Sequence, residues 1–465
     1  MKNIKIDQLS LFIIFTLCVG LIPFNNGFYL FFPVAIFIFL FYWLQQPYKP
    51  GVFTLILVQH FLQIASAVWL CNYLNKEINY NTSSRSIAIM ASSIGLCFLL
   101  APIIHYHQST RIQTKKSLYE FVKNFSTEKV MYLYIIFFFI SALLGSIAFM
   151  FGGFTQVIFS LVNLKWLLFL LFGYTCFFKK EKINIFYLFV GLEFLNGFLG
   201  FFSDFKTVIY FMIVLLFSMI DRLNFKHVFY GILLFIFLGF FALLWGSVKG
   251  EYRAFLNGGT KSQNVTVDKG EAIQKLGELS NNVSESELSS SVGGFLDRLQ
   301  YTYHFAKTID RMPSVLPFEN GGNWLSSLHY TTTLRLFNPD KPEFDATVKT
   351  KKYTGIRYAG RAQGVSFSLG YFADCFIDFG IFGMMGMLLL LGLIYRFIYS
   401  YLLTKASKNL VFNYAVVGTF FLEFNALEMD STFLLGRLFA SSLTFLFLIQ
   451  FVFPRLLQYI SVKDK

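Results

Sequence analysis

Basic side chains gather in one polar stretch of this chain, where they could hold an anion. Between residues 320 and 370, seven basic side chains stand against three acidic ones. Arginine is a better phosphate ligand than lysine, because its planar fork binds two oxygens at once. The sequence therefore predicts phosphate ligands among the arginines of this stretch and of its approach: Arg253, Arg335, Arg357 and Arg361.

The lysines of the same stretch have two interpretations. The run from Lys349 to Lys352 fits a solvated basic face as well as it fits a binding surface. Lys351 and Lys352 are expected to lie in water, where an exposed charge contributes little to stability.

Other charges fall inside or beside long apolar runs, where each one needs a physical reason. The acids and bases so placed are Glu193, Glu423, Arg437, Lys165, Lys206, Glu428 and Asp430. One interpretation is that they pair with each other or extend to the membrane surface. The other is that Lys206, Arg437 and their neighbours converge at one face and hold an anion there.

These residues are carried by a chain with the composition of a membrane protein. Of its 465 residues 55% are hydrophobic and only 14% are charged. Apolar runs of about 20 residues recur, as bilayer-crossing helices require. We expect an all-α polytopic membrane protein with about twelve spans, at residues 8–23, 28–44, 52–74, 86–104, 130–150, 161–178, 183–202, 205–220, 227–247, 371–395, 410–427 and 432–453.

The distribution of Lys and Arg predicts the orientation of these spans. With the N-terminus inside, the inner segments hold 19 of these residues and the short outer segments hold four. Cytoplasmic loops of membrane proteins are enriched in Lys and Arg. Both termini are therefore expected in the cytoplasm. The net charge of +13 reflects topology, and no nucleic-acid partner is expected.

Three regions follow from this topology. Residues 1–247 would hold spans one to nine, 248–370 one large extracytoplasmic loop, and 371–465 spans ten to twelve with a cytoplasmic C-terminus. Residues 257–294 are rich in Gly, Ser, Asn and Glu and are expected to be weakly ordered. Apolar residues recur at helical spacing over 295–311, which predicts an amphipathic helix on the outer surface.

The sequence lacks the motifs of nucleotide-using and metal-dependent enzymes. It contains no Walker loop, no G-x-G-x-x-G, no H-E-x-x-H and no G-x-S-x-G. The largest inner loop, 105–129, is too short for a nucleotide-binding domain. We expect no cofactor and no metal ion, so that any substrate would be an activated molecule already in the membrane.

Four stretches of the chain have a pattern known from one family: GFFSDFKTVIYF (200–211), WGSVKGEYR (245–253), RLFNPDKPEFD (335–345) and NALEMDSTFLLGR (425–437). They resemble the oligosaccharide repeat-unit polymerases, the Wzy class that makes O-antigen and related surface polysaccharides. Lys206 stands where many relatives have arginine, and the likeness in topology covers nearly the whole chain.

The resemblance implies a GT-C-like helical bundle in the bacterial cytoplasmic (inner) membrane. Its substrate would be an undecaprenyl-pyrophosphate-linked oligosaccharide, and the growing glycan would move from its lipid carrier to a new lipid-linked unit. Lys206, Arg253, Arg335, Arg357, Arg361 and Arg437 would hold the pyrophosphate. Membrane lipid is an expected partner, and a chain-length regulator protein is a candidate partner.

The implied reaction also needs a base for the acceptor hydroxyl. Three residues of the outer face are candidates: His329, Glu428 and Asp430. Two alternatives stay open, which are an O-antigen ligase-like glycan transferase and a transporter of polysaccharide or lipid-linked sugar. Transporters usually show internal repeats and interrupted helices, and this sequence shows neither clearly.

The predicted topology can be tested by chemical labelling of intact cells. In a variant without the native cysteines, Ser286→Cys is expected to react with a membrane-impermeant thiol reagent, because it lies in the outer loop. Ser407→Cys is expected to be protected, because it lies between two cytoplasmic span ends. Equal protection of both positions would contradict the orientation.

Overall fold

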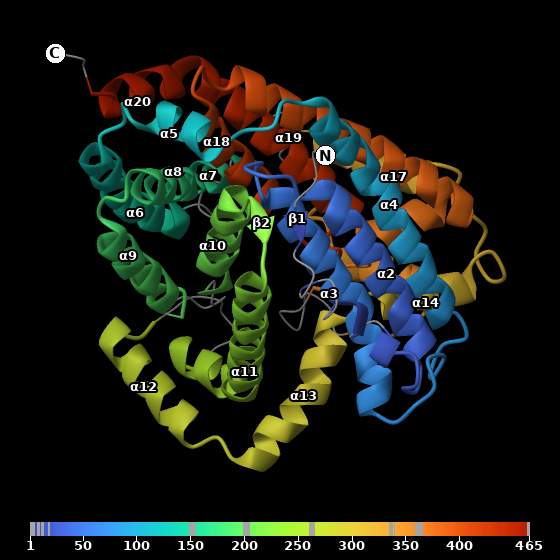
Figure 1. The fold of residues 1–465 in the computed structure, drawn as a ribbon. Coiled ribbons are helices and arrows are strands. Elements are labelled where there is room, and N and C mark those ends of the chain that lie inside the picture. The colour runs from blue at the N-terminus through green and yellow to red at the C-terminus, as the bar shows by residue number, and fades with distance from the viewer. Residues whose placement is uncertain are drawn as a thin grey trace.

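The computed structural model describes residues 5–6, 10, 14–16, 19–147, 155–198, 205–259, 266–333, 338, 340–358 and 366–462. Its helices form one bundle around a large apolar core, with α2, α3 and α4 on one side and α6, α8 and α9 on the other (Figure 1). In the described chain the helices before the large loop are α2 Gly27–Leu44, α3 Val52–Tyr73, α4 Arg85–Ser109, α5 Lys115–Val122, α6 Thr127–Ile147, α7 Thr155–Val162, α8 Leu164–Lys179, α9 Ile183–Asn196, α10 Phe205–Met219 and α11 Phe225–Leu256.

The remaining helices belong to the large loop and to the C-terminal region. The loop holds α12 Lys269–Asn281, α13 Glu285–Leu299, α14 Thr302–Arg311, α15 Gly322–Thr332 and α16 Ala346–Thr354. The C-terminal region holds α17 Tyr371–Lys405, α18 Leu410–Leu422, α19 Ser431–Phe447, the π-helical turn η3 Leu448–Val452 and α20 Phe453–Ile460. Two short strands, β1 Lys5–Ile6 and β2 Arg222–Leu223, pair in parallel.

Eight helical segments of the described chain are long and apolar enough to cross a bilayer, which confirms an all-helical membrane protein. The expected spans at 183–202, 205–220 and 410–427 appear as the shorter apolar helices α9, α10 and α18. Seven of the sixteen residues of the expected span at 8–23 lie outside the described residues.

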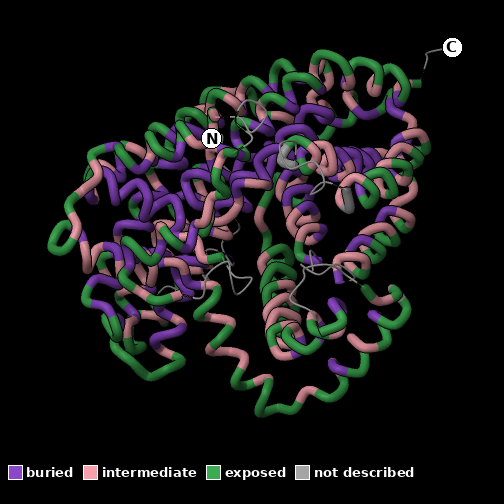
Figure 2. The backbone as a smooth tube through the Cα atoms, turned by 180° about the vertical axis from the view of Figure 1, so that it is seen from behind, coloured by how far each residue is buried: buried purple, intermediate pink, exposed green. Residues whose placement is uncertain are grey.

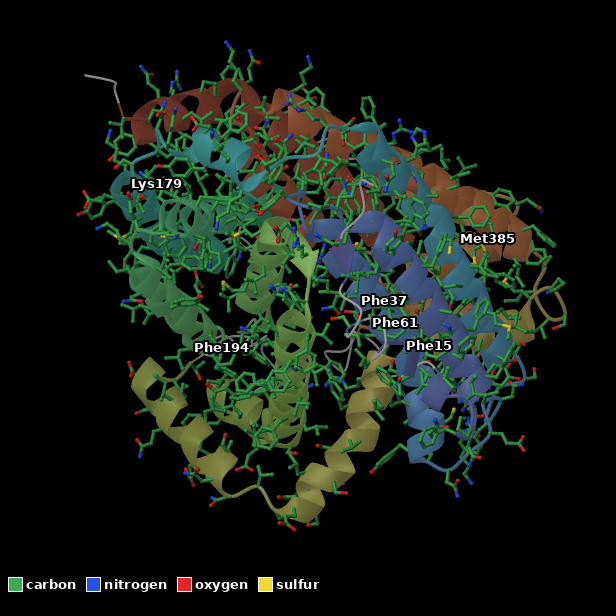
Figure 3. All side chains as sticks on the ribbon, viewed as in Figure 1. Phe15, Phe37, Phe61, Lys179, Phe194 and Met385 are labelled. Atoms are coloured by element: carbon green, nitrogen blue, oxygen red, sulfur yellow. The ribbon has the colours of Figure 1, made fainter. Side chains whose placement is uncertain are left out.

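Aromatic packing fills the space between the helices. Phe37 of α2 and Phe61 of α3 lie side by side, with ring centroids 4.6 Å apart (Figure 3). Buried residues follow the inward faces of the bundle helices, whereas α12 is largely exposed (Figure 2). Close aromatic contacts of this kind add to the stability from buried area.

The segment expected to be weakly ordered contains two helices instead. Ala272 and Leu279 of α12 are buried against Val248, Tyr252 and Leu256 at the end of α11. The composition of 257–294 concealed these few apolar residues at helical spacing, which suffice to hold α12 on its neighbour.

The single amphipathic helix expected over 295–311 is divided. Helix α13 ends at Leu299 and α14 begins at Thr302, because the backbone N–H of Tyr301 donates to the Gln63 carbonyl of α3 at 3.2 Å. The Gln300 side chain accepts a bond from the N–H of Tyr303 at 3.2 Å. A contact with a helix more than 200 residues away therefore sets the break.

Helix α17 folds back on itself at Gly380, which has φ 69° and ψ −167°. Phe372, Met384 and Leu388 all pack against Gly95 of α4. Sixteen residues of continuous helix would span about 24 Å, so Phe372 and Leu388 can share one neighbour only if residues 371–379 run beside the first turns of 381–405. The network described below lies on this short first segment.

Replacing Gly380 by Ala is expected to destabilise the fold. Its backbone conformation is essentially restricted to glycine and costs other residues about 1–3 kcal/mol. The added Cβ would also lie 3.1 Å from Cζ of Phe318. Thermal unfolding in detergent should show a clearly lower melting temperature for G380A.

Gly386→Ala in the same helix is the matched control. Nothing lies within 4 Å of a Cβ at Gly386, and alanine favours a helix over glycine by about 1 kcal/mol. If G380A unfolded at the same temperature as G386A, the turn at Gly380 would not be what the geometry indicates.

Candidate functional site

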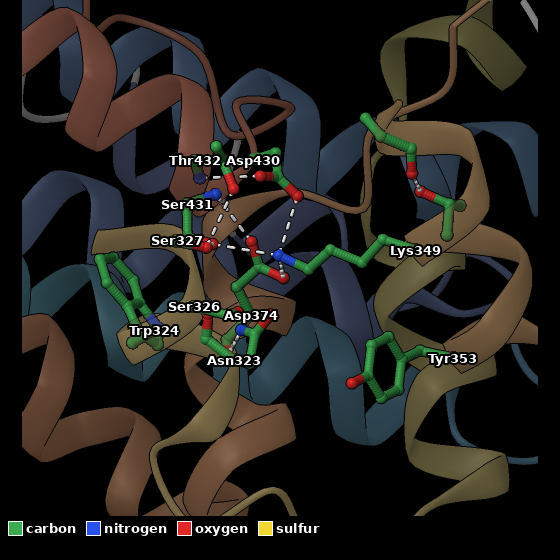
Figure 4. A network of polar contacts seen from close by, with 12 residues as sticks. Asn323, Trp324, Ser326, Ser327, Lys349, Tyr353, Asp374, Asp430, Ser431 and Thr432 are labelled. Carbon is green, nitrogen blue, oxygen red and sulfur yellow. Dashed lines mark hydrogen bonds and ion pairs between the residues drawn. The ribbon is translucent and has the colours of Figure 1, made fainter. Parts of the chain in front are cut away.

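A buried lysine joins the large loop to the helix bundle (Figure 4). The ammonium of Lys349, on α16, lies 2.8 Å from Oδ1 of Asp374 and 2.9 Å from Oδ2 of Asp430. It also donates a hydrogen bond to the Ser431 hydroxyl at 3.0 Å. Both carboxylates are fully buried, and the Lys349 side chain is only 12% exposed.

The same carboxylates cap the first turn of α19. Asp430 is its N-cap residue and accepts a bond from the N–H of Thr432 at 2.8 Å. Oδ2 of Asp374 accepts from the N–H of Ser431 at 2.7 Å. Helix N-termini carry unpaired amides and a partial positive charge, so two carboxylates are favourable there.

Helix α15 receives its cap from α17. Its own N-cap residue, Gly321, has no side chain, and the Asp378 carboxylate accepts instead from the N–H groups of Asn323 and Trp324, both at 3.0 Å. The Asn323 amide donates to the carbonyl of Asp374 at 3.1 Å. Asp374 and Asp378 stand four residues apart and so share one face of the short helix.

Three hydroxyls complete the network between α15 and α19. The oxygens of Ser327 and Ser431 are 2.8 Å apart, and the Thr432 hydroxyl donates to Ser327 at 2.9 Å. Buried polar groups are costly when they lack partners, and here they satisfy one another.

The charge state of Lys349 follows from its surroundings. Burial by itself lowers the pKa of the ammonium, but the adjacent carboxylates of Asp374 and Asp430 outweigh it and hold the pKa above its usual value. The lysine is therefore cationic at neutral pH, and its single charge offsets part of the charge of the two carboxylates that it joins. The three charges form a buried ion bridge in a region of low dielectric constant. Removing any one of them would leave the others without their charge partner.

A second ion pair lies at the solvent side of α16. The Lys352 ammonium is 2.7 Å from Oε1 of Glu319, and the Tyr353 hydroxyl donates to the same oxygen at 2.6 Å. The bond from Lys352, followed by that from Tyr353, lowers the pKa of Glu319. The Lys352 side chain is 53% exposed, so this pair is far more solvated than the Lys349 pair.

The three candidates for a base occupy different environments. Asp430 is buried in the network, whereas Glu428, two residues before it, is exposed and accepts a bond from the Gln63 amide at 2.9 Å. The Gln63 oxygen in turn accepts from the N–H of Leu427 at 2.7 Å. His329 is exposed on α15. Asp430 therefore has a structural role in the network, whereas Glu428 and His329 are accessible.

The six candidate pyrophosphate ligands are spread over several segments. Arg357 is exposed just after the C-cap of α16, and Lys206 is exposed on α10. Arg437 is exposed on α19 and donates to the Glu423 carbonyl at 3.3 Å. Arg253 is partly buried near the end of α11. Arg335 and Arg361 lie outside the described residues.

Sequence reasoning missed the centre of this site. Lys349 belongs to a run that fits a solvated face, yet it is buried, while Lys351 and Lys352 are exposed as expected. Asp374 and Asp378 were also overlooked. The sequence feature that could have identified them is a pair of acids four residues apart at the start of an apolar run, where burying a charge costs free energy. Within the described residues no group of His, Cys, Asp or Glu is arranged to hold a metal ion.

Lys349→Met is expected to destabilise the protein strongly. Removing one partner of a buried ion pair leaves an uncompensated charge, which typically costs about 3–5 kcal/mol. Lys352→Met is the matched control on the same helix, and it should cost about 1 kcal/mol or less because its pair is exposed. The measurement is thermal unfolding of the purified variants in detergent.

A third variant separates lost charge balance from lost packing. In K349M/D374N/D430N no charge remains, and each asparagine keeps an oxygen that can accept from the α19 amides. Its melting temperature should lie well above that of K349M. Equal melting temperatures for K349M and K352M would contradict the role given to Lys349.

Comparisons with known proteins place the chain in a family without assigning an activity. No curated protein and no solved structure matches the sequence. A family model described as a domain of unknown function (DUF8712) matches residues 27–456. This match includes the bundle from α2 onward, the whole large loop and the buried network. The chain therefore belongs to the DUF8712 family.

Proposed function

We propose that this protein is a polymerase of lipid-linked oligosaccharides in the bacterial cytoplasmic membrane. Both termini lie in the cytoplasm, and the reaction takes place at the outer face. The donor is a glycan on undecaprenyl pyrophosphate, and the acceptor is a second lipid-linked repeat unit. This proposal rests on the motif resemblance, on the absence of nucleotide-binding motifs from the sequence and on the arrangement around Lys349.

The observation that carries the proposal is the contact between a basic loop segment and an acidic turn. Lys349 reaches Asp430 at 2.9 Å, and Glu428 stands two residues before that aspartate. Arg357 follows the C-cap of the lysine's own helix by two residues. A fixed bridge between these segments suits a reaction that needs a cation at the leaving group and an acid near the acceptor.

The reaction balances without a cofactor. An acceptor hydroxyl attacks the anomeric carbon of the donor, a new glycosidic C–O bond forms, and the bond to the pyrophosphate breaks. The hydroxyl proton passes to a base, for which the exposed Glu428 and His329 are better placed than the buried Asp430. Undecaprenyl pyrophosphate leaves with the bonding electrons, and cationic side chains stabilise its growing charge.

Arg357 is the first ligand to test, because it is exposed beside the anchored helix. Arg357→Ala should leave the protein folded and inserted, while single lipid-linked units accumulate and polymer is lost. Removal of one preorganised donor typically lowers the rate about a hundredfold to a thousandfold. Arg357→Lys should restore only part of the activity, because lysine lacks the two-pronged fork.

Lys351→Gln is the control, since Lys351 is exposed on α16 close to Arg357 in the sequence. It should retain polymer at nearly the normal level. The measurement is the ratio of polymer to single repeat units on extracted lipid-linked glycans. Loss of polymer in K351Q together with normal polymer in R357A would refute this assignment.

A further inference from the structure

Helix α15 buries polar side chains and exposes two leucines. Its buried side chains are Asn323 and Ser327, which point into the network (Figure 4). Leu325 and Leu328, in contrast, are 66% and 46% exposed, and Ser326, His329 and Thr332 are exposed on the same helix. A helix at a water-exposed surface usually buries its apolar side chains. The two exposed leucines therefore indicate that their part of the outer face of α15 does not meet water.

The position of α15 indicates what surrounds its exposed leucines. The helix contacts both α17 and α19, which are among the segments long and apolar enough to cross a bilayer. Near its N-terminus, Gly321 packs against Phe379, and Phe382 just past the α17 turn is 93% exposed. Exposed apolar side chains continue along α17 and α19, at Leu390, Leu393, Phe397, Leu443 and Phe447. The leucines of α15 thus belong to a helix that packs on two candidate spans, each of which also exposes apolar side chains.

The depth of the loop supports the same conclusion. Helix α3 has 22 residues and is about 33 Å long, close to the thickness of a bilayer core. His60 and Gln63 lie near its middle. His60 is bonded to the Tyr371 hydroxyl at 2.5 Å, and Gln63 contacts Tyr301 and Leu427. Both ends of the 301–371 segment therefore reach the midpoint of a helix as long as the bilayer is thick.

From these observations we propose that part of the large loop is re-entrant, and that α15 presents Leu325 and Leu328 to lipid acyl chains. This inference does not depend on the proposed polymerase activity. It revises the expectation that all of 248–370 lies outside the bilayer, and it places the Lys349 network behind a lipid-facing helix.

The backbone chemistry is compatible with this location. Irregular backbone at membrane depth is tolerated where protein groups satisfy its polar atoms. Gln63 does so twice, since its carbonyl accepts from Tyr301 N–H at 3.2 Å and its side-chain oxygen accepts from Leu427 N–H at 2.7 Å. The amides at the start of α15 are capped by Asp378. These backbone amides are thus satisfied by groups of the protein itself.

The test uses the full chain in phospholipid nanodiscs, with one nitroxide spin label at a time on a variant without the native cysteines. Labels are placed at Leu325→Cys and Leu328→Cys. Phe397→Cys, on the exposed apolar face of α17, serves as the lipid control, and Ser286→Cys, on the polar α13, serves as the water control. Collisions with oxygen, which partitions into lipid, are compared with collisions with a water-soluble nickel chelate.

The ratio of oxygen to nickel accessibility at positions 325 and 328 should match that at 397 and exceed that at 286 several-fold. A ratio like that at 286 would place α15 in water and overturn the proposal. Protection from both reagents would also overturn it, because protein would then cover the helix. Spin–spin broadening between labels would identify that protein as a second copy.

A second measurement keeps the test decisive if the cysteine-free variant does not fold. The native chain in the same nanodiscs is treated with a lipid-soluble photoactivated diazirine and analysed by mass spectrometry of its peptides. Residues 322–332 should carry the label, and residues 285–299 should not. Absence of label from 322–332, with label present on α17, would refute the lipid contact.

Discussion

The placement of one cation between two buried carboxylates determines how the two parts of this protein fit together. Asp374 and Asp430 supply the acceptors that the first turn of α19 requires, but two carboxylates side by side in a medium of low dielectric repel each other. Lys349 offsets that repulsion, and it comes from the large loop, not from the bundle. The bundle therefore completes its own polar interior only when the loop is in place. The loop in turn gains a fixed position only by reaching the bundle.

Other costly charges in the described chain follow the same rule. Lys165 lies 3.0 Å from Glu193, which also accepts from the Tyr134 hydroxyl at 2.7 Å. Glu423 accepts from Asn163 and from the Ser441 hydroxyl. Each group connects two or more helices, which supports a structural interpretation of these charges. What remains accessible near the loop is a smaller set, and it includes Arg357, Glu428 and His329.

The functional proposal and the re-entrant loop converge on one physical picture. A lipid-linked substrate stays in the membrane, so a site for it must be reachable from lipid and must still hold charged groups. A helix that exposes two leucines and buries Asn323 and Ser327 suits both needs, because it would separate the ionic network from lipid. The family match covers the loop as well as the bundle, so both are parts of one unit.

The sequence alone was sufficient for properties that depend on local composition. Apolar runs of bilayer length identified most of the helices, since each backbone polar group in lipid has to be satisfied within its own segment. The resemblance directed attention to the turn at 425–437, and its Asp430 proved to be part of the buried network. Tertiary structure decided which charges are buried. Lys349 and Lys352 are three residues apart and chemically identical, yet one is enclosed by aspartates from two distant helices and the other faces water. The fold-back at Gly380, the break at Tyr301 and the burial of Asn323 and Ser327 on α15 also depend on partners far along the chain. A charge or a turn is stabilised by what surrounds it, and those surroundings exist only once the helices have packed.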